Sequence, residues 1–237
     1  MLFYATRIEH GFAHLEEEES RHLLTVLRHQ VGDRLQLTDG RGNIYDGEIA
    51  EASKRNLSIR LLATTPVPPE RPARLHLAIA PTKQMERLEW CLEKATEIGV
   101  DDITLLRCQH SERDTVRLDR LQKVLVSAMK QSLRAWLPKL HGLVPFRQFV
   151  ASTTEAQKRI AWCADSPLPH LQNTLTVGQN TLIAIGPEGD FSPEEVALAQ
   201  QHGFVGVGLG PARLRTETAG LLAVATFNLQ GKVEFFI

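Results

Sequence analysis

The sequence has few cysteines and no long apolar run, and each absence excludes a class of protein. Its three cysteines, Cys91, Cys108 and Cys163, are scattered and form no CxxC pair, which fits a reducing cytoplasm better than a disulfide framework. No apolar stretch approaches membrane-spanning length, and the first residues lack the apolar segment of a secretory signal. We therefore expect a cytoplasmic protein that does not associate with a membrane.

Strong net charge and the common nucleotide-binding motifs are also missing. The 237 residues carry a net charge of −1, so a nucleic-acid partner has to be argued from a local surface. A G-x-x-x-x-G-K-[ST] loop is absent. Gly206, Gly208 and Gly210 alternate within a predicted strand instead of following one as G-x-G-x-x-G. These patterns argue against a P-loop protein and a NAD-type dehydrogenase. We find no metal-ligand cluster and expect no metal.

A glycine-rich stretch at 181–220 is what the sequence offers instead, and seven of the 16 glycines lie there. Leu182–Ile185 predicts a buried strand, followed by a turn at 186–190 and by a helix with an S-x-x-E capping box at Ser192. Phe204–Leu209 predicts a second strand, and a second glycine turn precedes a terminal helix at 216–230. Ligands of open α/β sheets bind at the carboxyl ends of strands, so the turns indicate a ligand site. Ordinary α/β turns remain the alternative.

The rest of the chain divides into a β-rich part and an α/β part. Strands are expected at 2–5, 34–38, 44–50 and 57–62, with one helix at 17–28. Four prolines between Pro66 and Pro72 predict a stiff linker after residue 63. Five candidate strands then alternate with helices, at 76–80, 103–106, 159–163, 182–185 and 204–209, which favours a mostly parallel sheet. His76 is interpreted as a core histidine with satisfied hydrogen bonds.

Two motifs carry a family resemblance. GPEGDFSPEE at 186–195 and LGPARLRTETA at 209–219 resemble the two ligand-loop motifs of the 16S ribosomal RNA (uracil-N3) methyltransferases, which belong to the SPOUT superfamily. The spacing of His22–Arg28 before Asp33 and Asp39 is similar to that of the family's PUA-like domain. The resemblance implies an α/β fold with a knotted, SPOUT-type, mostly parallel sheet after a small PUA-like β-barrel. We expect domains at 1–68 and 73–237.

The resemblance also implies a cofactor and a set of site residues. Both loops are expected to form a trefoil knot around S-adenosylmethionine, with glycines that allow close backbone approach. The expected cofactor-binding residues are Gly186, Pro187, Glu188, Gly189, Leu209, Gly210, Leu214, Arg215, Thr216, Thr218 and Ala219. Arg215 is the candidate for stabilising a uracil oxyanion, and Glu217 for accepting or orienting the N3 proton. Glu217 could instead cap backbone N–H groups at the helix start.

The basic stretch at 107–148 is the candidate RNA surface. It holds nine Lys or Arg residues against three Asp or Glu, although such a run is also typical of an ordinary solvated face. Ser111-Glu112-Arg113 and Gln131-Ser132-x-Arg134 are similar to family motifs. The RNA contacts expected are Arg28, Arg113, Lys130 and Arg134.

Taken with the resemblance, these patterns predict an enzyme that methylates N3 of a uridine in 16S ribosomal RNA with S-adenosylmethionine. Its substrate would be the RNA or the assembled small subunit, and it would act as a homodimer. Two alternatives are a ribose 2′-O methyltransferase of the same superfamily and an RNA-binding protein without activity. A binding protein does not account for two intact donor-loop motifs.

Overall fold

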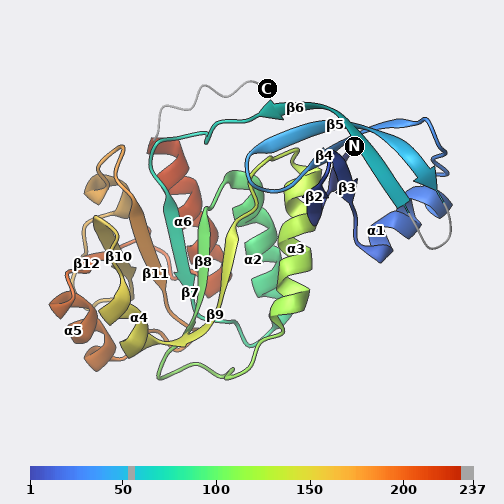
Figure 1. Ribbon diagram of the computed structural model, residues 1–237. Helices are drawn as coiled ribbons and strands as arrows, with labels where there is room; N and C mark the ends of the chain where they lie inside the picture. Colours follow the sequence, from blue (N-terminus) through green and yellow to red (C-terminus); the bar gives the residue numbers. More distant parts are fainter. Residues whose placement is uncertain (53–56, 231–237) are drawn as a thin grey trace. The chain divides into compact units, whose positions relative to one another are not determined.

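The computed structural model describes residues 1–52 and 57–230, which form two compact units (Figure 1). The first unit comprises Met1–Pro69 and Val126–Leu137, and the second comprises Glu70–Leu125 and Pro138–Ile237. Helix α3, Leu118–Gln131, therefore contributes its last residues to the first unit. The expected domain bounds, 1–68 and 73–237, place 126–137 in the second domain.

The first unit is built on a six-stranded sheet in the order β1-β4-β5-β6-β3-β2, in which only β1 and β4 are parallel. Alternation in these strands buries one set of side chains, including Leu37, Ile49 and Ile59, which are fully inaccessible. The strands are β1 (Leu2–Tyr4), β2 (Arg7–Glu9), β3 (Phe12–His14), β4 (Arg34–Thr38), β5 (Asn43–Ala52) and β6 (Leu57–Pro66).

Two predictions for this unit were wrong in detail. The single helix expected at 17–28 is a short α-helix, α1 (Glu17–Arg21), followed by a π-helical segment, η1 (His22–Val26). The Thr25 hydroxyl donates to the carbonyl of Arg21 at 2.6 Å, a bond that competes with regular helix geometry. The expected linker also begins later, because β6 continues through Pro66 and pairs with β5 along its whole length.

The segment 126–137 is held to the first unit mainly by backbone bonds. The carbonyl of Ala135 accepts from the N–H of Gly42 at 2.9 Å, and the N–H of Leu137 donates to the carbonyl of Gly40 at 2.9 Å. The Trp136 indole N–H donates to the carbonyl of Val67 at 3.1 Å. Gly42 has φ +88°, and a Cβ there would lie 2.2 Å from the Trp136 ring. Only glycine satisfies both demands.

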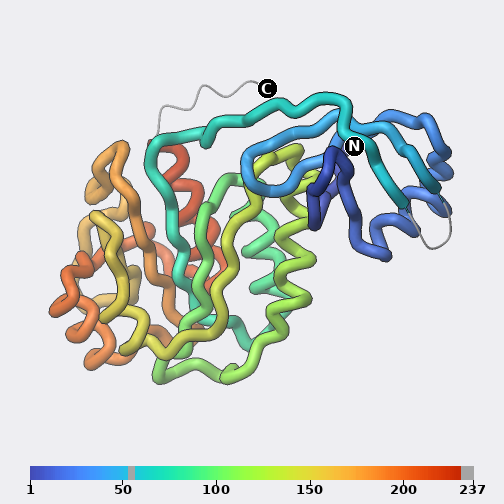
Figure 2. The backbone as a smooth tube through the Cα atoms, viewed as in Figure 1, coloured from blue at the N-terminus to red at the C-terminus, as the bar shows by residue number. Residues whose placement is uncertain are grey.

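The second unit contains a six-stranded, fully parallel sheet in the order β12-β10-β11-β7-β8-β9. The path of the chain through this sheet can be followed in Figure 2. Five of its strands match the predicted ones, and the sixth, β9, lies in the basic stretch, where apolar residues do not alternate clearly. The strands are β7 (Leu75–Ile79), β8 (Asp102–Arg107), β9 (Lys139–Pro145), β10 (Gln157–Ala161), β11 (Thr181–Ile185) and β12 (Val205–Val207).

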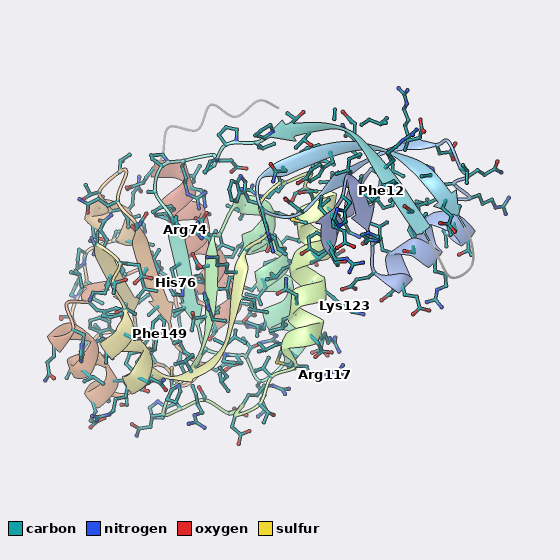
Figure 3. The ribbon with its side chains drawn as sticks, viewed as in Figure 1. Phe12, Arg74, His76, Arg117, Lys123 and Phe149 are labelled. Atoms are coloured by element: carbon teal, nitrogen blue, oxygen red, sulfur yellow. The ribbon has the colours of Figure 1, made fainter. Side chains whose placement is uncertain are left out.

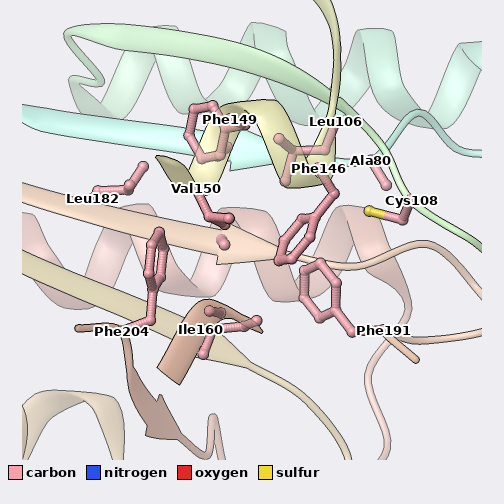
Figure 4. Close-up of a cluster of buried hydrophobic side chains, with 13 residues drawn as sticks. Ala80, Leu106, Cys108, Phe146, Phe149, Val150, Ile160, Leu182, Phe191 and Phe204 are labelled. Carbon is pink, nitrogen blue, oxygen red and sulfur yellow. The ribbon is translucent and has the colours of Figure 1, made fainter. Parts of the chain in front are cut away.

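Helices cover both faces of this sheet (Figure 1). Helices α2 (Met85–Ile98) and α6 (Thr216–Gln230) pack against each other and over β7, where Gly220 of α6 lies close to Ile79. On the other face, α4 (Phe146–Ser152) and α5 (Pro193–Gln201) pack together, and an apolar cluster that includes Leu182 and Phe204 fills the space (Figure 4). Each face of the sheet packs a different set of side chains, because successive residues of a strand point to opposite sides.

Candidate functional site

The chemistry-bearing loops of the second unit follow the carboxyl ends of its parallel strands. Loop 186–190 follows β11 and loop 208–215 follows β12, so both lie at the edge where ligands of parallel sheets bind. Loops 80–84 and 108–113, which follow β7 and β8, reach the same edge. We refer to 186–190 as the first loop and to 209–215 as the second loop.

The first loop is fixed by its own side chains and by the helix that follows it. Ser192 accepts from the N–H of Glu195 and Glu195 accepts from the N–H of Ser192, which completes the predicted capping box. Asp190 has φ +64°, a conformation that aspartate tolerates better than most residues. Its carboxylate accepts from the N–H of Cys163 at 2.8 Å and from that of Phe191 at 2.7 Å.

The glycines of the first loop make room for protein side chains. A Cβ at Gly186 would lie 3.1 Å from the ring of Phe191, and one at Gly189 would lie 2.9 Å from the Cβ of His110. The His110 ring also lies within 3.0 Å of the carbonyls of Gly189 and Asp190 through its Nδ1. The close approach expected at these two glycines is therefore made at least partly by the chain itself.

The second loop has few backbone hydrogen bonds in the described part of the chain. Among the described residues, no hydrogen bond engages the main chain from Leu209 to Leu214, although both leucines are half-buried. Gly210 has φ +130° with open space where a Cβ would point. The two loops meet where the Thr216 hydroxyl donates to the carbonyl of Gly186 at 3.1 Å. The arrangement offers free N–H and C=O groups beside apolar side chains.

A chain of hydrogen bonds braces the first loop from two neighbouring strand ends. The Arg113 guanidinium donates to the carbonyl of Thr82 at 3.1 Å and to that of Lys83 at 2.9 and 2.6 Å. The N–H of Lys83 in turn donates to Glu188 in the first loop at 2.8 Å. Arg113, expected to contact RNA, thus has two of its five N–H donors committed to the protein.

The two catalytic candidates, Arg215 and Glu217, differ in their exposure to solvent. Arg215 is exposed, and no ion pair or hydrogen bond engages its side chain within the described residues. Glu217 is buried with 7% exposure and lies 3.9 Å from the Nε of Arg87 on α2. Burial raises the pKa of the neighbouring Cys91 thiol to about 12, and the Glu217 charge adds to this effect. Glu217 therefore lies on the side of α6 that faces α2.

The remaining RNA candidates belong to the first unit. Lys130 is ion-paired with Glu19 at 2.9 Å, and the same carboxylate accepts from the N–H of Tyr4, so much of its charge is neutralised locally. Arg28 has φ +59°, an uncommon conformation for a long side chain that marks local strain. Arg134 lies in the segment that joins the first unit.

The amino ends of the strands carry structural rather than reactive groups. His76 lies between Glu155, 2.6 Å from its Nδ1, and Thr104, 2.7 Å from its Nε2. Its ring packs edge-on against Phe149 (Figure 3). The interpretation of His76 as a satisfied core histidine is confirmed. The described residues contain no group of side chains arranged to hold a metal and no helix able to cross a membrane.

Comparison with known proteins identifies the family. A model described as an RNA methyltransferase domain matches residues 69–228, and one described as an RNA methyltransferase PUA domain matches residues 15–62. A curated Ribosomal RNA small subunit methyltransferase E from Mycobacterium bovis is 31% identical, with 97% of this chain and 91% of the relative covered. The chain belongs to this family of RNA methyltransferases.

Solved structures agree with this assignment. A probable rRNA-methyltransferase from Porphyromonas gingivalis is 43% identical with a TM-score of 0.89, covering 97% of this chain and 98% of the other. A Ribosomal RNA small subunit methyltransferase E from Neisseria gonorrhoeae, bound to S-adenosyl methionine, is 26% identical with a TM-score of 0.83, covering 97% of each chain. The family and the fold class predicted from the sequence, a SPOUT-type parallel sheet domain with a small PUA-like domain, are confirmed.

Two residues of this methyltransferase site were not predicted from the sequence. Lys83 and His110 both contact the first loop, and neither was assigned a role. Each follows a parallel strand at its carboxyl end, β7 and β8 respectively. Ligand loops gather at the carboxyl ends of parallel strands, and the strands predicted at 76–80 and 103–106 are the sequence signal that points to both residues.

Proposed function

We propose that this methyltransferase transfers a methyl group from S-adenosylmethionine to N3 of a uridine in 16S ribosomal RNA. The observation that carries the proposal is the junction of the two loops at one sheet edge, where Thr216 bonds to Gly186. In the sequence these loops bear the two motifs of the uracil-N3 family. We propose that the enzyme works in the cytoplasm, on the RNA or on the assembled small subunit.

The residues at the site fit S-adenosylmethionine. This cofactor has an adenine, an amino-acid tail and no phosphate, so it calls for backbone groups and apolar surface rather than a lysine-bearing loop. The unpaired backbone of 209–214 and the half-buried Leu209 and Leu214 provide both. We assign the cofactor to residues 186–189 and to the second loop, with Thr216, Thr218 and Ala219 at the start of α6. When bound, the cofactor supplies an electrophilic methyl group.

The acceptor sets the demands on the protein. N3 of uracil lies on the base-pairing edge, so the base has to be unpaired to react. Its proton has to leave, and the negative charge that develops on the base requires stabilisation. We assign charge stabilisation to the exposed Arg215. Glu217 is the proposed proton acceptor or orienter, and its burial against α2 favours the orienting role.

We further propose that the enzyme is a homodimer, since the family's acceptor pocket lies between two knotted subunits. The division of labour that we propose gives residues 1–68 to RNA binding and 73–237 to methyl transfer. Light scattering at micromolar concentration should report twice the mass of one chain. A single-chain mass would count against the dimer without affecting the assignment of the donor site.

One assay tests the reaction. Purified enzyme, labelled S-adenosylmethionine and small-subunit ribosomal RNA, free or assembled, should yield 3-methyluridine on nucleoside mass spectrometry. A methyl group on the ribose would instead establish the 2′-O alternative, and binding without transfer would establish a non-catalytic protein. Placing the target uridine in a duplex should abolish the reaction, because pairing hides N3 but leaves a ribose hydroxyl exposed.

The role of Arg215 has its own test. Arg215→Ala should lower kcat strongly, by about 10²–10³, if the guanidinium stabilises developing charge, while cofactor affinity changes far less. Arg117→Ala removes an equally charged side chain from an exposed surface pair with Asp119 and serves as the matched control. Equal kcat values for the two variants would remove Arg215 from the mechanism.

A further inference from the structure

A pocket with no ligand assigned to it lies beside the first loop. It has a volume of about 430 Å³ and is formed by the end of β8, the start of α4 and the first turn of α5. This volume lies within the usual range for a small-molecule site. It is also large enough for one nucleotide. All of its lining residues belong to the second unit.

The lining of this pocket has a mixed character. Arg107 and Arg147 line it and are exposed, and within the described residues neither side chain has a hydrogen bond or ion pair. Leu198 contributes partly exposed apolar surface, whereas Phe146, also in the lining, is only 2% exposed. Asp114, Glu194 and Glu195 contribute carboxylates, and Glu195 already accepts from the N–H groups of Gln109 and Ser192. A third guanidinium of the lining, that of Arg113, donates to the carbonyls of Thr82 and Lys83. Guanidinium groups bind phosphate, apolar surface packs against a base, and a carboxylate accepts from hydroxyl or amino groups. An inorganic anion would use only the first of these features.

The position of the pocket connects it to methyl transfer. Cys108, Gln109 and Ser111 line it, and His110, in the same turn, contacts the carbonyls of Gly189 and Asp190 in the first loop. One short segment therefore separates the pocket from the proposed cofactor site. When RNA presents a uridine to the cofactor, the nucleotides next to that uridine in the strand lie close to the cofactor site. They can therefore reach a pocket that is one short segment away.

We propose that this pocket receives an unpaired nucleotide of the RNA substrate other than the methylated uridine. Arg107 and Arg147 bind its phosphate, and its base lies against the apolar lining. The proposal rests on the proposed function and places RNA contact on two guanidiniums that have no partner in residues 1–52 and 57–230. The predicted contacts Arg113 and Lys130 are, by contrast, already engaged with the protein.

The test uses an rRNA fragment that contains the target uridine, with binding measured as a function of salt. The double variant Arg107→Ala, Arg147→Ala should bind about tenfold more weakly. Its log–log salt slope should fall by about 0.7 for each single-strand phosphate that the protein no longer neutralises. Affinity for S-adenosylmethionine should not change, which also reports that the variant is folded. Arg117→Ala in the same unit is the control and should retain the wild-type slope.

A second variant distinguishes a nucleotide pocket from a surface phosphate contact. Leu198→Trp leaves the charge unchanged but fills the pocket, so it should weaken RNA binding with an unaltered salt slope. Ultraviolet cross-linking of the wild-type complex should join RNA to the peptide that contains Leu198. If Leu198→Trp binds RNA normally and no such cross-link forms, no nucleotide enters and the proposal is wrong. If wild-type enzyme neither binds nor methylates the fragment, it is the proposed function that fails.

Discussion

Replacing Arg113 by alanine removes the link between the β7 and β8 loops and, through Lys83, the support of Glu188 in the first loop. The guanidinium makes three hydrogen bonds of 2.6–3.1 Å with two carbonyl groups. Hydrogen bonds to charged groups contribute about 1.5–3 kcal/mol, and because Arg113 is only half-buried we take about 1–2 kcal/mol for the whole group. If the first loop loses this support, the Kd for S-adenosylmethionine should rise about five- to thirtyfold.

Calorimetric titration of S-adenosylmethionine into Arg113→Ala measures this effect directly. Arg113→Lys keeps the charge but cannot reproduce the planar fork, so it should bind the cofactor nearly as poorly as the alanine variant. Arg107→Ala, a few residues earlier and without a protein partner among the described residues, should bind the cofactor normally. A folded Arg113→Ala variant with wild-type cofactor affinity would show that the Arg113 hydrogen bonds do not support the first loop. Arg113 would then remain only a predicted RNA contact.

Three further predictions concern stability. Gly42→Ala should destabilise the protein by about 2–4 kcal/mol in urea unfolding, because the φ of +88° and the Trp136 ring 2.2 Å from the added Cβ both oppose it; a change below about 0.5 kcal/mol would contradict this. Ser192→Ala should cost about 1 kcal/mol by removing the helix cap, with Thr as the conservative control. Burial opposes ionisation of Glu155, but the hydrogen bond with His76, backbone hydrogen bonds and the charge of His76 together outweigh it and lower the pKa below its ordinary 4.5. The stability that Glu155 adds should be present above pH 4.5 and should disappear as pH falls through the folded-state value, a step that Glu155→Gln should lack.

Local signals in the sequence predicted much of the fold. The capping box at Ser192 and the helix Thr216–Gln230 have their predicted bounds, because both depend on neighbours within one or two helical turns. Strand β9 was not predicted, because its charged and small residues interrupt the alternation of apolar and polar residues that marks a half-buried strand. The π-helical turn at His22–Val26 was missed because the expected apolar spacing is that of an ordinary α-helix.

The site was predictable only in part, for a similar reason. The two loops are continuous motifs, and their position at strand ends follows from the order of the elements. Which partner each side chain takes depends on residues far away in the chain. Arg113 bonds to Thr82 and Lys83, and Lys130 pairs with Glu19, 111 positions away. The count of charges and the family motifs mark both cations as RNA contacts, but neither reveals these protein partners.

The return of 126–137 to the first unit has a consequence for the order in which the nascent chain can fold. Once Pro69 has been synthesised, the first unit still lacks the groups that bond to Gly40, Gly42 and Val67. These groups arrive only with Leu137, several seconds later at ordinary rates of chain elongation. Meanwhile the α2 region emerges with its apolar face uncovered, since its partner α6 is made last. The first unit therefore cannot be completed until Leu137 has left the ribosome, and the second cannot cover the apolar face of α2 until α6 has followed.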